Sequence, residues 1–241
     1  MRKLKTWLGR VIRDIERQIA KDTALQDIFR RELWQAERVR TQKPRDGKGR
    51  HVYALHAPEV ECIGKGKSHK PWEFGVKVSV ATTIRRSRGG QFVVHAMALP
   101  GKPHDGHTLR TVLPEIERLV GAPVQRVLTD AGYRGHKLPS PWKFKVFVDG
   151  QKRRMTKAIR RLMKRRAAVE PVIGHLKAEH RMGRNYLAHR MGDAINAILA
   201  AVGYNFRLLR RFIAQLLLRL IQIWLFGLAQ RRQTIPAAPQ G

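Results

Sequence analysis

The fold is decided by residues 124–136, VQRVLTDAGYRGH, in which an apolar run stops abruptly at Asp130. The apolar side chains of VQRVLT predict a buried strand, and the glycine-containing AGYRGH predicts an exit into a polar loop. Ligands bind at the carboxyl ends of the strands in open α/β sheets, so Asp130 is a candidate metal ligand. The alternative is a turn aspartate that bonds to its own backbone. Tyr133 and Arg134 are candidates for contact with phosphate or base.

Helix and strand patterns surround this stretch. An amphipathic helix is expected over 2–20, and a second one, capped by Asp22 or Thr23, runs to about residue 40. Strands are expected over 51–56, 74–83, 91–100 (after a turn at Gly89-Gly90) and 143–150. Further helices are expected over 107–121, capped by Asp105 or Thr108 and ended by Gly121; from 156 to about 177, where Pro171 kinks or restarts the helix; and over 194–228. This order predicts an α/β domain.

The charge balance is strongly basic. The 241 residues include 49 Lys and Arg against 18 Asp and Glu, a formal net charge of +31, while 43% of residues are hydrophobic. The hydrophobic content is sufficient for a core, so the chain is not a disordered polycation. A polyanionic partner would neutralise the self-repulsion, and nucleic acid is the first candidate. Acidic proteins and anionic membranes are the alternatives.

Cysteine content and apolar runs limit the cellular setting. Cys62 is the single cysteine, which excludes an internal disulfide and fits a reducing cytoplasm. The first helix is charged throughout, unlike a signal peptide. The most apolar stretch, 212–228, is interrupted by Gln215, Arg219 and Gln222, and falls short of a membrane span. It is expected to be a core or partner-facing helix, with an interfacial membrane helix as the alternative.

A basic region surrounds Glu170. Residues 152–166, KRRMTKAIRRLMKRR, contain nine basic residues and no acid. Arg166, Glu170 and Lys177 are spaced four and seven apart, so one continuous helix would present them on one face. Glu170 is then either a surface ion-pair partner or a metal ligand among phosphate-binding cations.

These residues resemble the signature of insertion-sequence DDE transposases: Tyr, two residues, Arg, three residues, Glu, six residues, Lys. Arg166, Glu170 and Lys177 occupy the matching positions, and Met163 stands in the Tyr position. Further phrases are similar to transposases of the insertion-sequence-five group: YALHAPEVECIGKGKSHKPWEFGVKVSVATT, ALPGKPHDGHTL, LTDAGYRGH, RRAAVEPVIGHLKAEHRMGRNYL and GDAINAILAAVGYNFRLL. The resemblance covers nearly the whole chain.

The resemblance implies a ribonuclease H-like mixed sheet with flanking helices, and three carboxylates that bind two divalent cations, Mg²⁺ or Mn²⁺, for phosphoryl transfer. It implies that Asp130 is the second acid and Glu170 the third, and that both are metal ligands. It also implies that Arg166 and Lys177 grip transposon-end DNA. Arg165 and His175 are further candidates for DNA contact on the same helix. The expected partners are double-stranded transposon-end and target DNA, and the expected location is the bacterial cytoplasm, on the nucleoid.

The family's first catalytic Asp is expected on an opening strand, upstream of the helical insertion that resembles residues 2–40. That strand is missing from this sequence, so the chain is expected to be an amino-terminally truncated transposase with impaired activity. Asp105 is expected to be a helix cap, and Glu73 is the least implausible replacement for the first Asp. The remaining candidates lie in or between helix patterns and are poor substitutes: Asp14, Asp22 and Asp27.

The expected division of the chain is a helical insertion (1–41), a partial catalytic domain (42–190), a carboxy-terminal helical segment (191–229) and a disordered tail (230–241). A second hypothesis is a non-catalytic fragment that occupies transposon ends, self-associates or inhibits full-length transposase. An RNA-binding protein would explain the charge but not the DDE phrases. Three tryptophans are expected to be packing residues: Trp34, Trp72 and Trp142. The spacing of His104, His107 and His136 is not that of a zinc site. No role is predicted for Glu59, Glu61 and Cys62.

Overall fold

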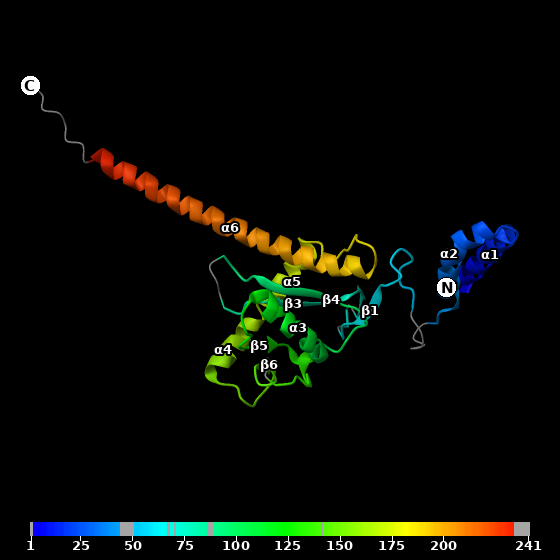
Figure 1. Ribbon diagram of the computed structural model, residues 1–241, viewed down its shortest axis with the longest axis horizontal. Coiled ribbons are helices and arrows are strands. Elements are labelled where there is room, and N and C mark those ends of the chain that lie inside the picture. The colour runs from blue at the N-terminus through cyan, green and yellow to red at the C-terminus, as the bar shows by residue number, and fades with distance from the viewer. Residues whose placement is uncertain are drawn as a thin grey trace, which may run out of the picture. The chain divides into compact units, whose positions relative to one another are not determined.

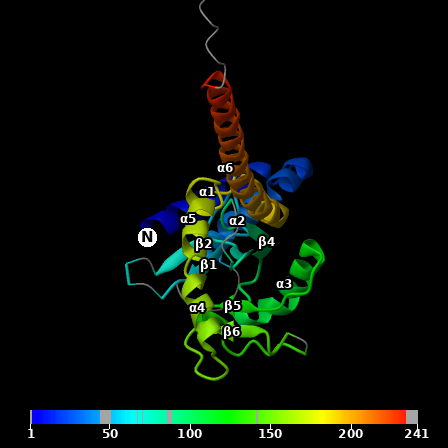
Figure 2. The same cartoon turned by 90° about the vertical axis from the view of Figure 1, so that its left-hand side faces the viewer.

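The computed structural model describes residues 2–43, 51–66, 68–69, 71–85, 89–140 and 142–233, and Figures 1 and 2 label its helices and strands. The chain divides into two compact units. The first comprises Met1–Lys77, Pro100–Lys102 and Ala188–Arg190, and the second comprises Val78–Leu99, Pro103–Leu187 and Met191–Gly241. Residues 44–50, and 234–241 of the predicted tail, lie outside the described residues.

The first unit begins with two helices, α1 (Arg2–Ile19) and α2 (Thr23–Thr41), which pack against each other. Ile12 and Ile19 of the apolar stripe of α1 are buried. Asp22 caps α2, because its carboxylate accepts hydrogen bonds from two backbone N–H groups of the first turn. Both predicted helices and the Asp22 cap are confirmed.

The predicted strand over 51–56 is wrong. The Val52 N–H donates to the side-chain oxygen of Gln42 at 3.0 Å, and the Gln42 side-chain nitrogen donates to the Val52 carbonyl at 3.3 Å. These bonds occupy both backbone polar groups of Val52, which a strand would need for its ladder. A side chain ten residues upstream has replaced a strand partner.

Two short strands follow, β1 (Glu61–Gly64) and β2 (Trp72–Gly75), and they pair antiparallel. The predicted strand over 74–83 is divided at this point. Gly75 ends β2 with a φ of 140°, a conformation that L side chains rarely adopt, and β3 (Lys77–Thr82) then begins with a different partner.

The second unit carries two small sheets. In one, β3 is hydrogen-bonded to β4 (Val93–Leu99); in the other, β5 (Val127–Thr129) pairs parallel with β6 (Val146–Val148). Strands combined with helices among the described residues confirm the predicted α/β class.

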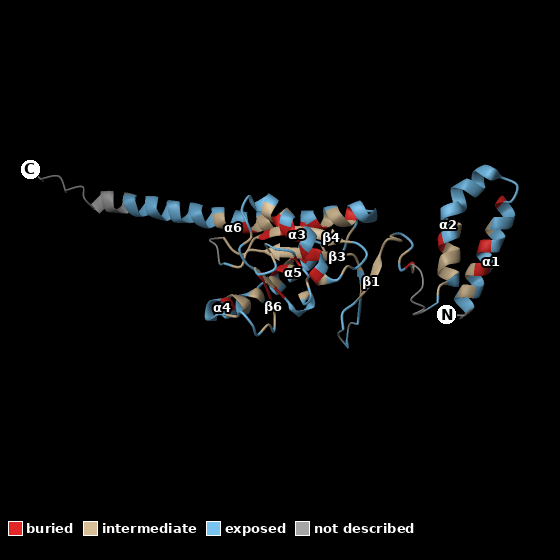
Figure 3. Cartoon of the chain, turned by 60° about the horizontal axis from the view of Figure 1, so that its bottom comes forward, coloured by how far each residue is buried: buried red, intermediate tan, exposed pale blue. Residues whose placement is uncertain are grey.

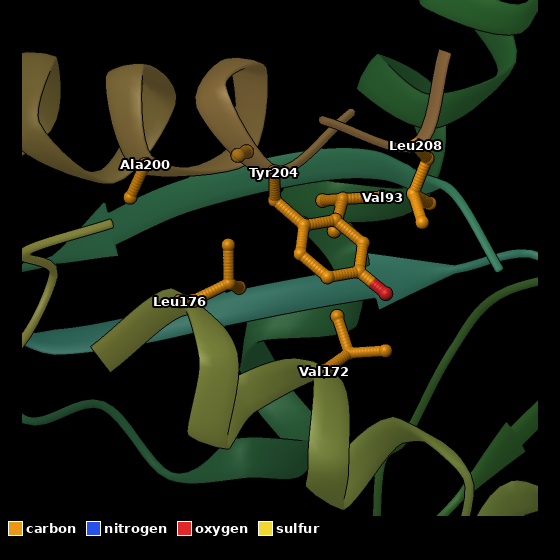
Figure 4. Close-up of a cluster of buried hydrophobic side chains, with 7 residues drawn as sticks. Val93, Val172, Leu176, Ala200, Tyr204 and Leu208 are labelled. Carbon is orange, nitrogen blue, oxygen red and sulfur yellow. The ribbon is translucent and has the colours of Figure 1, made fainter. Parts of the chain in front are cut away.

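One face of the β3–β4 sheet is covered by α5 (Val169–Ala178) and by α6 (His189–Gln233). Figure 4 shows this apolar cluster, in which the ring of Tyr204 lies between the two helices and the sheet. Leu176 of α5 has no exposed surface. Asn205 fixes α6 to the sheet edge, because its side chain accepts from the Val93 N–H (2.9 Å) and donates to the Val93 carbonyl (2.7 Å).

The other face of the same sheet packs on α3 (Asp105–Val120), where Leu113 is almost fully buried. Adjacent residues of β3 divide between the two clusters: Val80 packs toward α5 and α6, and Ala81 packs toward α3. This alternation is what a two-residue strand period requires of a sheet that is covered on both faces. The β5–β6 pair joins the cluster under α3.

The predicted helix at 107–121 is confirmed as α3, which ends at Gly121 with φ 68°. Its start differs from the prediction. His104 is the cap, with its ring Nδ1 accepting from the Gly106 N–H at 3.2 Å, so the assignment of Asp105 or Thr108 as cap is wrong. Asp105 is instead the first residue of the helix.

The predicted helix from 156 to 177 is two helices, α4 (Lys157–Arg166) and α5. Thr156 caps α4 by accepting from the Ile159 N–H. Pro171 lies in the first turn of α5, where its missing N–H costs no intrahelical hydrogen bond. The predicted restart near Pro171 is confirmed: α4 ends at Arg166, and α5 begins at Val169, two residues before Pro171.

The last helix, α6, is longer than the predicted 194–228 and reaches Gln233, so the first residues of the predicted tail are helical. Gly203 does not interrupt it; a Cβ there would lie 3.0 Å from the ring Nδ1 of His180, so the glycine permits close packing. The large apolar side chains from Ile213 to Phe226 are exposed, as the pale blue part of α6 in Figure 3 shows.

Candidate active site

The carboxyl ends of β5 and β6 bring two aspartates to the same sheet edge. In the parallel register Thr129 lies opposite Val148, so Asp130 and Asp149 follow neighbouring strand ends. The Asp149 N–H donates to the Thr129 carbonyl at 3.0 Å, which continues the ladder to this edge. The strand that ends at Asp130 was predicted; the second strand carries the same signal, an acid after a short buried run, and could have been used in the same way.

Asp130 also makes the local bond that the alternative interpretation expected. It caps the short 3₁₀ turn Ala131–Tyr133, and its Oδ1 accepts from the Gly132 N–H at 3.1 Å. This bond fixes the carboxylate at the strand end and does not exclude a cation on its remaining lone pairs.

Another aspartate, Asp105, comes close to Asp130 from the start of α3. A Cβ built on Gly132 would lie 2.8 Å from Oδ2 of Asp105 and 3.2 Å from Oδ1 of Asp130. The two carboxylates therefore border one small space that is open because residue 132 is glycine. Asp105 was not predicted as a site residue, since only the tertiary fold brings α3 to the end of β5.

Tyr133 lies directly beside this carboxylate pair. Burial, and then the negative charges of Asp105 and Asp130, raise the pKa of the Tyr133 hydroxyl to about 12. Its ring packs against the apolar cluster under α3. The phenol therefore stays protonated beside the two carboxylates.

Two arginines contact Asp149 at this sheet edge. Arg166, at the end of α4, pairs with the Asp149 carboxylate at 3.4 Å, and Arg134 donates to the Asp149 carbonyl at 3.2 Å. Arg166 is largely covered, with 19% of its side chain exposed, and its Nε is buried without a hydrogen-bond partner. Arg165 beside it is exposed.

Glu170 and Lys177 lie on α5, in its first and last turns, and both are exposed. Because the chain breaks between α4 and α5, Arg166 does not share their helix, and the prediction that all three lie on one helical face is wrong. His175 is held by an ion pair with Glu179, which also pairs with Arg207. Its imidazole is therefore engaged within the protein.

The comparison with protein-family models identifies the family of this carboxylate-bearing domain. A model described as "Transposase DDE domain" matches residues 35–206, well over half of the chain. The chain belongs to the DDE transposase domain family. Searches among curated proteins and among solved structures gave no match. The predicted family is thereby confirmed, while its insertion-sequence-five group stays a prediction.

Membership of the DDE transposase domain family indicates DNA transposition by nuclease and strand-transfer chemistry, and the family uses divalent metal ions, typically Mg²⁺. Among the residues that the structure describes, no three His, Cys, Asp or Glu side chains gather closely enough to hold a metal ion. Glu170 thus does not join a three-residue cluster with Asp130. None of the described helices is long and apolar enough to span a membrane.

The residues considered as replacements for the first Asp of a DDE transposase have other partners. Asp14 and Asp27 pair with arginines one helical turn away, and Asp22 caps α2, so their exclusion agrees with the structure. Glu73 forms an ion pair with Lys65. Asp105 differs from these residues, because its carboxylate borders the same small space as that of Asp130.

The packing prediction has different outcomes for the three tryptophans. Trp142 packs under α3 and its ring N–H donates to Glu117 at 3.2 Å, which confirms the packing prediction. Trp34 and Trp72 are 62% and 54% exposed, so that prediction is wrong for them. His104 caps α3, and its ring lies tilted against that of His107 with the ring centres 5.2 Å apart. Glu59 and Glu61, which had no assigned role, each accept a backbone N–H.

Proposed function

We propose that this chain binds transposon-end DNA and cleaves and transfers DNA strands by divalent-metal-dependent phosphoryl transfer, with low activity as an isolated chain. The observation that carries the proposal is the convergence of Asp105 and Asp130 on Gly132. Carboxylate oxygens are the ligands that Mg²⁺ and Mn²⁺ prefer, and two carboxylates at one point suit a cation that keeps several waters.

Asp105 and Asp130 would hold the metal ion, and Glu170 would complete its ligands when DNA is bound. A bound cation would supply Lewis-acid activation and would neutralise charge on the reacting phosphate. Tyr133 would lie beside the two carboxylates as a neutral phenol. Arg166 and Arg134 hold Asp149 at the edge and keep positive charge near the phosphate path.

DNA binding is supported by the charge of the chain and by α4. The exposed cations of α4, among them Lys164 and Arg165, form one basic surface next to the carboxylate edge. Each phosphate contact releases condensed counterions, so DNA affinity should fall steeply as salt rises. Arg165→Gln should lower the slope of log affinity against log salt by about one. A flat salt response would remove the basis for this part of the proposal.

Low activity is proposed because the described residues contain no group of three metal-ligating side chains. The two sheets of the second unit each have two strands, which leaves strand edges that a further strand could join. In the ribonuclease H-like arrangement that the family resemblance implies, that strand carries the first Asp.

The test of activity is nicking of supercoiled plasmid that carries the DNA flanking the coding sequence. The isolated chain should give little or no Mg²⁺-dependent product. Abundant nicking that Asp130→Ala abolishes would contradict the proposed impairment while supporting the assignment of Asp130. The second candidate, a non-catalytic fragment that occupies transposon ends, is favoured by the same missing ligand group and predicts salt-dependent binding with no nicking.

We also propose that the chain self-associates through α6. Ten large apolar side chains between Ile213 and Phe226 are 46–69% exposed. A single partner helix can cover only one side of α6, so the interface would use the side chains that share one face. Ile213, Leu216, Leu220 and Ile223 have the alternating three- and four-residue spacing of a helix–helix seam. Full-length transposase with the same segment would be an equivalent partner.

A further inference from the structure

The first turn of α3 lies in direct contact with the loop that follows β5. A Cβ built on Gly106 would lie 2.9 Å from the His136 Cα and 3.2 Å from the Tyr133 carbonyl oxygen, so this contact depends on glycine at residue 106. Asp105 immediately precedes this glycine, and Asp130 immediately precedes the loop. The close approach of the two backbones therefore brings the two carboxylates near each other.

The Tyr133 hydroxyl links the same two segments to the sheet. It is hydrogen-bonded to the hydroxyl of Thr108, in the first turn of α3, and to the hydroxyl of Ser79, on β3. Ser79 and Ala81 are two residues apart on β3, so both side chains point to the face of the sheet that α3 covers. The phenol thus joins a strand and a helix to the loop that begins after Asp130.

The protons of these hydroxyl groups follow a fixed order. Thr108 is buried, and its Oγ1 donates to the Asp105 carbonyl oxygen at 2.7 Å. A threonine hydroxyl has one proton, so Thr108 accepts in its hydrogen bond with Tyr133. The phenol proton is used in that bond, and the Ser79 hydroxyl therefore donates to the phenol oxygen. The result is a chain of hydrogen bonds from Ser79 through Tyr133 and Thr108 to the backbone of Asp105.

This chain of hydrogen bonds ends at the residue whose carboxylate borders that of Asp130. Two carboxylates that border one small space repel each other, so other contacts must hold their backbones in place. The bond from Thr108 goes to the carbonyl oxygen of Asp105, so it fixes the residue without occupying a carboxylate oxygen. The arrangement supports the pair and leaves the Thr108 hydroxyl outside the ligand set.

We propose that Ser79, Thr108 and Tyr133 are positioning residues of the metal site, which set the separation of the Asp105 and Asp130 carboxylates without binding the ion themselves. The inference rests on the proposed divalent-metal site and adds the side chains that determine its geometry. Residues that support metal ligands in this way commonly change metal affinity by about 10- to 100-fold. The three hydroxyl groups therefore act on ion affinity and not only on packing.

The experiment measures the Mn²⁺ affinity of the full chain by electron paramagnetic resonance, together with its unfolding in urea. Tyr133→Phe keeps the ring, removes the bridging hydroxyl and should weaken Mn²⁺ binding by roughly 10-fold. Thr108→Val should have a similar effect, whereas Thr108→Ser keeps the hydroxyl and should bind Mn²⁺ as the wild type does. A purely structural role would lower the stability of these variants and leave the Mn²⁺ affinity of the folded chain unchanged.

A double variant and a second tyrosine sharpen the comparison. Because Tyr133 and Thr108 share one hydrogen bond, Tyr133→Phe combined with Thr108→Val should lose less Mn²⁺ affinity than the two single losses added together. Tyr204→Phe is the matched control, since Tyr204 is a buried tyrosine in the cluster on the other face of the sheet. It should bind Mn²⁺ as the wild type does.

The outcomes separate this inference from the proposed metal site. Wild-type Mn²⁺ affinity in folded Tyr133→Phe and Thr108→Val would overturn the inference and leave the metal site standing. An equal loss of affinity in Tyr204→Phe would overturn it as well. A wild-type chain that did not bind Mn²⁺ would overturn both. If one of these variants does not fold, the other and Ser79→Ala decide, because each removes one hydroxyl from the same chain of hydrogen bonds.

Discussion

Asp105 and Asp130, which lie on different elements, direct carboxylate oxygens at the same point above Gly132. Two carboxylates that border one small space repel each other. Burial, and then the negative charges of both aspartates, raise the pKa of the adjacent Tyr133 hydroxyl to about 12. A fold that keeps two carboxylates together gains from a cation between them. The proposal of a metal-dependent reaction therefore rests on this pair of carboxylates.

Gly132→Ala should weaken Mn²⁺ binding by roughly 10- to 100-fold, because supporting residues of metal sites have effects of this size. The new methyl group would lie 2.8 Å from the Asp105 oxygen and would force the carboxylates apart. Calorimetric titration with Mn²⁺ measures the change. Gly174→Ala is the control, since nothing lies within 4 Å of its Cβ; it should leave Mn²⁺ affinity unchanged. Equal affinity in Gly132→Ala and wild type would refute the prediction.

Leu176→Ala should lower the free energy of unfolding by about 2–5 kcal/mol, the range for a fully buried leucine. Leu176 has no exposed surface and joins α5 to α6 and the sheet. Urea unfolding followed by circular dichroism gives the value. Leu218→Ala, at a side chain that is 59% exposed, should change stability by less than about 0.5 kcal/mol. Similar losses for the two variants would show that α5 does not pack as described.

Acid should destabilise the protein through His180. Burial, and then the charge of His175, lower the pKa of His180 below its usual value of 6.5. The unfolded state then binds protons more readily, so the stability contribution is complete above about pH 6.5 and is lost as pH falls below it. The pKa of His136 is lowered too and acts in the same direction.

His180→Phe keeps a ring that can lie edge-on to Tyr204 and should reduce the fall in melting temperature between pH 7.5 and pH 5.5. Part of the fall should remain because of His136. An unchanged fall in the variant would remove His180 from the explanation.

Self-association through α6 should be visible by sedimentation. The triple variant Leu216→Gln, Leu220→Gln and Ile223→Gln should be a monomer with unchanged helix content. The control variant Gln215→Ala and Gln222→Ala should still self-associate. Because each copy carries a net charge of +31, added salt should strengthen the dimer by screening repulsion, the opposite of its effect on DNA affinity. A wild-type monomer at all salt concentrations would contradict the proposal.

Local signals predicted the parts of the fold that local physics controls. The cap at Asp22, the helix end at Gly121 and the strand that stops at Asp130 follow from neighbouring residues. The errors come from contacts between distant residues. The Gln42 side chain prevented a strand at Val52, and it has no signature in the residues around Val52 itself.

The candidate site shows the same division. Asp130 and Glu170 were found because a strand end and a motif mark them, whereas Asp105 depends on how α3 meets the end of β5. The expectation that Arg166, Glu170 and Lys177 share one helical face is wrong, because a new helix begins at Val169 and Pro171 favours such a first turn. The residue spacing was right, but the shared helical face was not.

The most direct test of the central claim is Mn²⁺ binding, followed by electron paramagnetic resonance of the free ion. The wild-type chain should bind Mn²⁺, and Asp105→Asn and Asp130→Asn should each lose most of that binding while keeping DNA affinity. Asp14→Asn, at an exposed residue paired with Arg17, is the matched control and should bind Mn²⁺ as the wild type does. Undiminished Mn²⁺ binding by Asp130→Asn would contradict the account.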